Sequence, residues 1–91
     1  MKIKQFDVVF KDESKDGFRL CGHVEEINSS GDVTIRWNHY RVGTKFIVHG
    51  GTLKYLNGEE VNRFLERFEI ISGIESVREA EACIIALRRL L

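Results

Sequence analysis

The sequence predicts a small α+β domain, in which a curled antiparallel sheet over residues 5–56 is followed by a short helix and a C-terminal amphipathic helix. Two neighbouring segments in the first half alternate hydrophobic and polar residues, as half-buried strands do. From residue 57 onward the hydrophobic residues recur every three or four positions, as in helices. With 91 residues and 43% hydrophobic content, the chain is expected to form one domain over residues 1–91, β-rich up to residue 56 and helical over residues 57–91.

The expected strands begin with Phe6–Phe10, a short run of aromatic and β-branched residues. The segment Phe18–Ile27 then alternates, and Val33–Trp37 alternates again after a turn that ends in Gly31 and Asp32. Two alternating runs joined by a Gly-Asp turn are typical of a β-hairpin. We therefore expect an antiparallel hairpin in the middle of the sheet.

A loop around residues 41–43 is expected after this hairpin, which would place Tyr40 in a loop. Two further short strands are predicted, Lys45–Val48 and Thr52–Leu56. The segment between them, His49–Gly51, is expected to form a tight turn or a bulge, since its two glycines tolerate unusual backbone angles.

Four hydrophobic residues in the second half share one helical face: Val61, Phe64, Leu65 and Phe68. Asn57, with Glu60 three positions later, is a candidate capping box for this helix. The residues that follow, Phe68–Ile71, fit either the last turn of the helix or a short strand. A second capping-box pattern, Ser76 with Glu79, precedes the amphipathic C-terminal helix.

The order of the expected strands resembles that of the SH3-like barrels, a group that includes the Tudor and KOW domains. The resemblance covers residues 5–56 and rests on Phe6–Val9 as an opening strand, Gly22–Ile27 before the Gly-Asp turn and Val33–Trp37 after it. It implies a half-open barrel formed by the sheet. It also implies a binding module rather than an enzyme, with aromatic residues and loops at one rim holding peptides or nucleic acid.

Positive charge is concentrated in one part of a chain that is neutral overall, with 14 Lys and Arg residues against 14 Asp and Glu residues. No acidic residue occurs over residues 33–58, whereas four cationic residues do: Arg36, Arg41, Lys45 and Lys54. The local field is therefore positive. Because nucleic-acid-binding domains usually carry an overall basic excess, the neutral net charge favours a protein partner over a nucleic acid.

The partner-binding surface is expected around residues 38–45, where aromatic and basic residues are mixed. Its members are Arg36, Trp37, His39, Tyr40, Arg41, Lys45 and Lys54. Trp37 has two interpretations, since it shares the alternation of Val33 and Ile35, as a core residue would, or joins Tyr40 and Phe46 in an aromatic platform. The predicted function is that of a small regulatory or adaptor protein that contacts a larger protein here. The alternative is a nucleic-acid-binding domain that uses the same positive patch.

Catalytic and metal sites are not expected. Sulfur and nitrogen ligands are present in Cys21, His23, His39 and His49, but their spacing differs from that of known zinc sites. Cys21 with a histidine is also the candidate pair of nucleophile and base, yet no oxyanion element or orienting acid can be identified beside it. We therefore expect no catalytic residue, no metal, no cofactor and no enzyme activity.

The sequence contains no run of residues that is long and apolar enough for a membrane span, and residues 1–5 lack the apolar core of a signal peptide. We therefore expect a cytoplasmic protein that makes no membrane contact, with Cys21 and Cys83 as free thiols. The C-terminal helix is expected to pack across the sheet. The alternative is that one flank of it, with Cys83, Ala86 and Leu90, meets another protein or forms a homodimer with a second copy.

Overall fold

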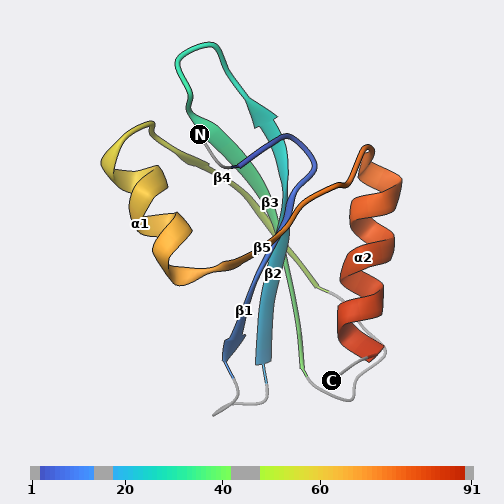
Figure 1. Cartoon of the computed structure of the whole chain (residues 1–91). Helices are drawn as coiled ribbons and strands as arrows, with labels where there is room; N and C mark the ends of the chain where they lie inside the picture. Colours follow the sequence, from blue (N-terminus) through green and yellow to red (C-terminus); the bar gives the residue numbers. More distant parts are fainter. Residues whose placement is uncertain (1–2, 14–17, 42–47, 90–91) are drawn as a thin grey trace.

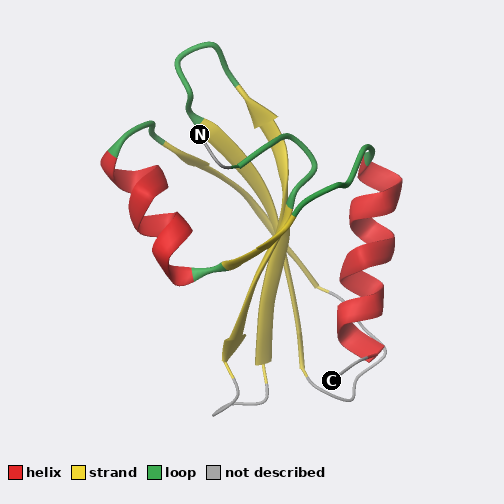
Figure 2. Cartoon of the chain, in the orientation of Figure 1, coloured by secondary structure: helices red, strands yellow, loops and turns green. Residues whose placement is uncertain are grey.

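The computed structural model describes residues 3–13, 18–41 and 48–89. Within these ranges the chain forms five strands and two helices: β1 (Val8–Glu13), β2 (Phe18–Ile27), β3 (Val33–Arg41), β4 (Val48–Tyr55), α1 (Glu59–Arg67), β5 (Glu69–Ile71) and α2 (Val77–Arg89). The strands form one antiparallel sheet in the order β4-β3-β2-β1-β5, which is not closed. Figures 1 and 2 show α1 and α2 on opposite sides of this sheet. The predicted α+β class is confirmed.

The central hairpin forms as predicted, with β2 and β3 paired along their whole length and a bulge in β2 between Val24 and Glu26. The side-chain oxygen of Asn28 closes the turn by accepting hydrogen bonds from the backbone N–H groups of Ser30 and Asp32, at 3.0 and 2.9 Å. Gly31 has a φ of 85°, a left-handed value that favours glycine. The polar turn residues therefore close the hairpin through local hydrogen bonds.

The region after the hairpin differs from the prediction. β3 continues to Arg41, so Tyr40 belongs to a strand and not to a loop. β4 is one strand from Val48 to Tyr55, and the tight turn predicted before Thr52 does not form. The bulge alternative is correct, because Trp37 pairs with Gly51 and Asn38 with His49, which leaves Gly50 as the extra residue. The rest of the predicted strand, residues 45–47, lies outside the described residues.

The first helix begins later than predicted. Gly58, with a φ of 88°, occupies the N-cap position of α1 and provides no side-chain cap. Glu60 accepts a hydrogen bond from the backbone N–H of Leu56 at 2.7 Å, so the predicted capping box with Asn57 does not form. The Asn57 side chain instead donates to the backbone oxygen of Ser30 at 2.8 Å. This contact ties the start of α1 to the turn of the central hairpin.

The remaining elements follow the sequence pattern more closely. Glu69–Ile71 is a strand, which pairs with Val8–Phe10 of β1 and selects the strand alternative for this segment. At α2 the backbone N–H of Glu79 donates to the Ser76 hydroxyl oxygen at 3.2 Å, as a capping box requires. The Glu79 carboxylate accepts from the backbone N–H of Glu75 rather than from that of Ser76. The cap therefore forms with its second half displaced by one residue.

Alternation along the strands places two separate cores on the two faces of the sheet. The core on the α1 side consists of Ile3, Val9, Val24, Val33, Ile35, Trp37, Val61 and Phe64. The core on the α2 side consists of Val8, Cys21, Ala80, Ile84 and Leu87. Helices cover both faces, and for this reason Cys21 and His23 are buried although they alternate with the hydrophobic residues of β2.

Candidate functional site

The structure separates the two adjacent residues at the centre of the predicted surface. Arg36 is exposed on the α2 side of the sheet, whereas Trp37 points to the α1 side and is only 5% exposed. The core interpretation of Trp37 is therefore correct, and Trp37 and Arg36 do not share one surface. Successive residues of a strand point to opposite faces, which explains the separation.

The other predicted site residues are only partly described. His39, Tyr40 and Arg41 contribute backbone to β3, and their side chains lie outside the described residues, as does all of Lys45. Lys54 is exposed on β4, with its Nζ atom 3.6 Å from a carboxylate oxygen of Asp32. Hydrogen bonds from the Asn57 backbone and the Asn28 side chain hold the pKa of Asp32 below its usual range. Of the predicted set, Arg36, Trp37 and Lys54 can be placed.

Trp37 belongs to a cluster of four aromatic rings beneath α1. Its ring centroid lies 5.9 Å from that of Phe64 and 5.3 Å from that of Phe68, and its Nε1 donates a hydrogen bond to the Tyr55 hydroxyl oxygen at 3.1 Å. Burial raises the pKa of Tyr55, whose hydroxyl is protonated at neutral pH even at the ordinary value of about 10. The cluster joins β3, β4 and α1 through rings in the favourable edge and offset geometries.

Glycine makes room for this cluster. Trp37 lies in register between Gly22 on β2 and Gly51 on β4. A Cβ atom on Gly22 would lie 2.9 Å from the Trp37 ring and 2.7 Å from the backbone oxygen of Arg36, closer than real Cβ contacts allow. The indole therefore fills the space that a side chain at position 22 would occupy, and glycine is required there.

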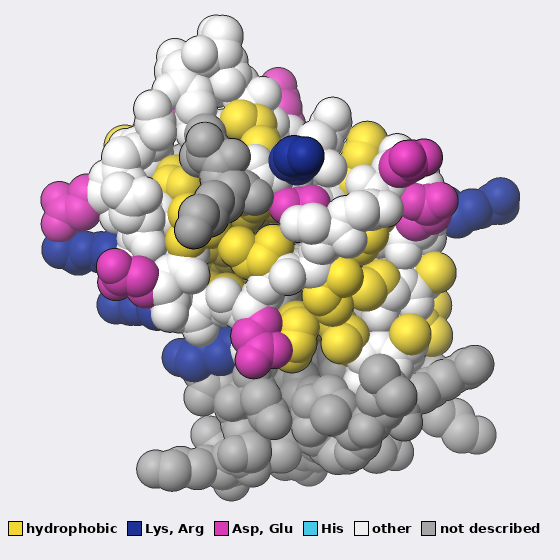
Figure 3. All heavy atoms as spheres, in the orientation of Figure 1, with side chains coloured by type: hydrophobic (Ala, Val, Ile, Leu, Met, Phe, Trp, Pro, Cys, Tyr) yellow, Lys and Arg dark blue, Asp and Glu magenta, His cyan; other side chains and the backbone are white. Residues whose placement is uncertain are grey.

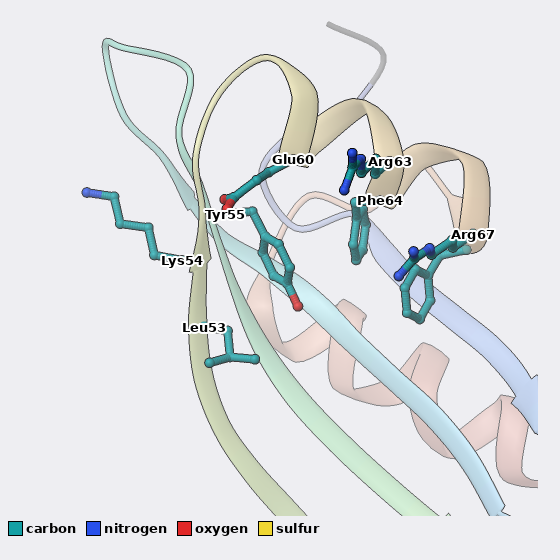
Figure 4. Close-up of a pocket in the computed structure, with 8 residues that line it drawn as sticks. Leu53, Lys54, Tyr55, Glu60, Arg63, Phe64 and Arg67 are labelled. Carbon is teal, nitrogen blue, oxygen red and sulfur yellow. The ribbon is translucent and has the colours of Figure 1, made fainter.

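A groove opens between α1 and β4 directly beside the aromatic cluster (Figure 4). It has a volume of about 420 Å³, and we call it the α1–β4 groove; its lining consists of Leu53, Lys54, Tyr55, Glu60, Arg63, Phe64, Arg67 and Phe68. A second hollow of about 250 Å³ shares Leu53, Tyr55 and Phe68 with it and extends over Leu20, Trp37 and Gly50. The two hollows together form a surface with an aromatic floor.

The exposed residues of the groove combine one apolar side chain with a positive rim. Leu53 is 56% exposed although it projects from β4 to the same face as Tyr55. Arg63 forms an ion pair with Glu59 on the outer surface of α1, whereas Arg67 has no ion pair among the residues that the structure describes. In Figure 3, charged side chains of both signs stand over α1. Two arginines, Arg63 and Arg67, line the groove, whereas Glu60 is the one acid among its described lining residues.

Sequence reasoning missed this groove, because its residues come from segments that no local pattern connects. Leu53, Lys54 and Tyr55 come from β4, and the rest of the rim and floor comes from α1 and its end. One signal was available: Arg63 with Arg67, and Phe64 with Phe68, lie four positions apart and so share helical faces. A prediction of the groove also requires the position of α1 relative to β4, and the sequence periodicity gives no information about that position.

The environment of Cys21 is the reverse of that of a nucleophile. Burial, with a smaller contribution from the neighbouring Cys83, raises the pKa of Cys21 to about 12, whereas reactive cysteines have a lowered pKa. Burial also lowers the pKa of His23, and the Nδ1 atom of this side chain has no hydrogen-bond partner among the residues that the structure describes. Both cysteines are free thiols, as predicted. Across the described residues, no three His, Cys, Asp or Glu side chains gather as metal ligands would.

In the part of the chain that the structure describes, neither helix is long and apolar enough to cross a membrane. No protein-family model matches the sequence, and comparison with the curated proteins and with the solved structures gives no match either. The resemblance to SH3-like barrels therefore stays a prediction. The predicted homodimer through α2 also stays a prediction. Of the three residues on the flank expected to form it, Cys83 is half-buried, Ala86 is exposed and Leu90 lies outside the described residues.

Proposed function

We propose that this protein is a non-catalytic binding module that holds a segment of a larger protein in the α1–β4 groove. The observation that carries the proposal is an exposed Leu53 above an aromatic floor, bordered by Arg63 and Arg67. An apolar centre with aromatic residues and arginine at its edge is the composition that distinguishes protein interfaces from the rest of a surface. The regulatory or adaptor role predicted from the sequence thus moves from residues 38–45 to this groove.

The volume of the groove is large enough to hold a side chain of the partner. The main hollow has a volume of about 420 Å³, which is within the range of ligand sites. The rings beneath it are held by packing and by the hydrogen bond between Trp37 and Tyr55, so the floor is rigid before a partner arrives. A preformed floor reduces the entropy lost on binding.

The geometry favours a protein partner over the alternative of a nucleic acid. Bases bind by stacking on exposed aromatic faces, and Trp37 is buried beneath α1. Of the four cations expected to contact phosphates, Lys54 already lies beside Asp32, and Arg36 projects to the other face of the sheet from the aromatic rings. For the pair Trp37 and Arg36, stacking and phosphate contact would thus have to occur on different surfaces.

A phage-displayed library of random octapeptides, selected on the immobilised full chain, tests the proposal. We expect enriched peptides that bind with micromolar dissociation constants and that lose at least about tenfold in affinity on the Leu53→Asp variant, because a buried carboxylate disrupts an apolar contact. The matched control is Val77→Asp, which changes another exposed apolar residue in the first turn of α2.

Binding to the Val77→Asp variant should equal binding to the wild type within about twofold, since the acid is favourable at a helix N-terminus and lies outside the groove. Circular dichroism of both variants checks that the fold is kept. The proposal is wrong if the library yields no enriched peptide, or if enriched peptides bind Leu53→Asp as tightly as they bind the wild type.

A further inference from the structure

Within residues 3–13, 18–41 and 48–89, the outer edge of β4, beside the groove, has no neighbouring strand. Among the described residues β4 pairs only with β3, and it has eight residues, whereas β5 at the other end has three. Alternate residues of an edge strand direct their N–H and C=O groups away from the sheet. The bulge at Gly50 interrupts this row, and regular pairing with β3 covers residues 51–55. The regular stretch borders the α1–β4 groove.

Cations stand on both sides of this edge. Arg63 and Arg67 lie on the groove side, above the face that carries Leu53. Lys54 extends in the opposite direction from Tyr55, as Figure 4 shows. Glu60, the one acid among the described residues that line the groove, already accepts a hydrogen bond from the Leu56 backbone at 2.7 Å. A chain that lies along the edge would therefore meet Arg67 and the ion-paired Arg63 on one face, and on the other face Lys54, whose Nζ atom lies 3.6 Å from Asp32.

We propose that the segment held in the groove is an extended, acidic stretch of the partner, which pairs with residues 51–55 of β4 as a sixth strand. This inference rests on the proposed function and specifies its partner. Successive side chains of the added strand would point alternately to the groove and to the opposite face. One of them would be an apolar residue over Leu53, and an acidic residue on the groove face would reach Arg67.

A second copy of this chain fits the edge less well. Antiparallel pairing of two β4 strands through residues 51–55 would bring the Lys54 residues of both copies to one side of the joint sheet. The arginines of both α1 helices would face the other side of the same joint. Like charges on neighbouring strands are unfavourable, so charge complementarity selects an acidic segment instead.

N-methylation of the peptide most enriched in the octapeptide selection tests strand addition. Two versions are made, each methylated at alternate backbone nitrogens, so that one blocks the nitrogens directed toward β4 and the other does not. We expect one version to bind at least about tenfold more weakly and the other to bind within about threefold of the unmodified peptide. Amide hydrogen exchange should slow at alternate residues over 51–55 when the unmodified peptide is bound.

Charge exchange tests the acidic character. The same peptide with lysine in place of its acidic residues should bind the wild type about threefold to tenfold more weakly, and the Arg67→Glu variant should recover part of that loss. Arg78→Glu on α2 is the matched control, and it should change the binding of either peptide by less than about twofold.

Three outcomes would overturn the inference. In the first, the selected peptides lose affinity on Leu53→Asp, but their two N-methylated versions bind equally. This result would leave the proposed function intact but exclude a sixth strand. The second is equal binding of the acidic and lysine peptides. The third is a concentration-dependent dimer in analytical ultracentrifugation that Leu53→Asp abolishes, which would make a second copy the occupant. Failure of the library selection itself counts against the proposed function.

Discussion

The two faces of the sheet are covered to different degrees. On one face α2, with thirteen residues, places the small side chain of Ala80 and the branched side chain of Ile84 against Val8 and Cys21, and these four residues are almost completely buried. On the other face α1, with nine residues, packs onto a cluster of large aromatic rings and leaves a groove beside Leu53. The α2 face is tightly packed around these four residues, although Arg36 is exposed on it and a hollow of about 190 Å³ lies between Asn38 and α2. The α1 face is open along β4.

Helix length accounts for much of this difference. An α-helix rises about 1.5 Å per residue, so α1 is about 13 Å long and α2 about 20 Å. β3, with nine residues, spans about 30 Å. The shorter helix cannot cover the length of the strands, and the longer one covers more of them. We infer that the α2 face mainly supplies stability and that the α1 face combines stability with binding.

The largest effect that we expect is a loss of stability caused by a substitution on the α2 face. Ile84→Ala removes a side chain that is 1% exposed, and we expect the free energy of unfolding to fall by about 2–5 kcal/mol, because the aliphatic contact is lost and a cavity remains. Urea denaturation followed by circular dichroism measures it. The neighbouring Ile85, which is 39% exposed, is the matched control, and Ile85→Ala should cost less than about 1 kcal/mol. Equal losses in the two variants would mean that α2 does not pack as described.

A smaller effect on the α2 face is a dependence of protein stability on pH. His23 is buried with Nδ1 unpaired, and burial lowers its pKa, with Arg36 and His49 acting in the same direction and Glu25 and Glu81 against it. The unfolded chain binds a proton below about pH 6.5 while the folded chain does not, so stability should fall as the pH drops from 7 toward the lower folded-state pKa.

His23→Leu tests this expectation, since it removes the titrating group and the unpaired buried atom together. The free energy of unfolding should then depend less on pH between 7 and 5, with little loss at pH 8, where the wild-type histidine is neutral in both states. Urea denaturation at each pH gives both curves. Parallel curves for the wild type and the variant would show that His23 does not contribute to the acid sensitivity.

The smallest expected effect lies on the open face. Leu53→Ser should change the free energy of unfolding by less than about 0.5 kcal/mol, because the side chain is mostly exposed in the unbound protein. Thermal and urea denaturation measure it beside Ile84→Ala. A loss comparable to that of Ile84→Ala would break the comparison, since it would show that the groove is a part of the core and not a free surface.

Local pattern in the sequence determined most of the elements. Alternation identified the β2–β3 hairpin, the spacing of Val61 and Phe64 identified α1, and the Ser76 cap located the start of α2. These features depend on neighbours within a few positions, and local periodicity records them. It failed where pairing between strands decided the outcome. β3 continues through Tyr40 because that residue pairs with Arg19 of β2, and β4 passes Gly50 as a bulge because the residues on both sides of it pair with β3.

Only the tertiary structure decided which residues form the candidate site. The alternation in β3 already separates Arg36 from Trp37, but the sequence alone does not show that a helix covers each face. Nor does it bring Leu53 of the edge strand next to Arg67 at the end of α1. The physical reason is that hydrophobic burial is not directional: it specifies that a face is covered, while helix length and the packing of the aromatic rings specify which part stays open.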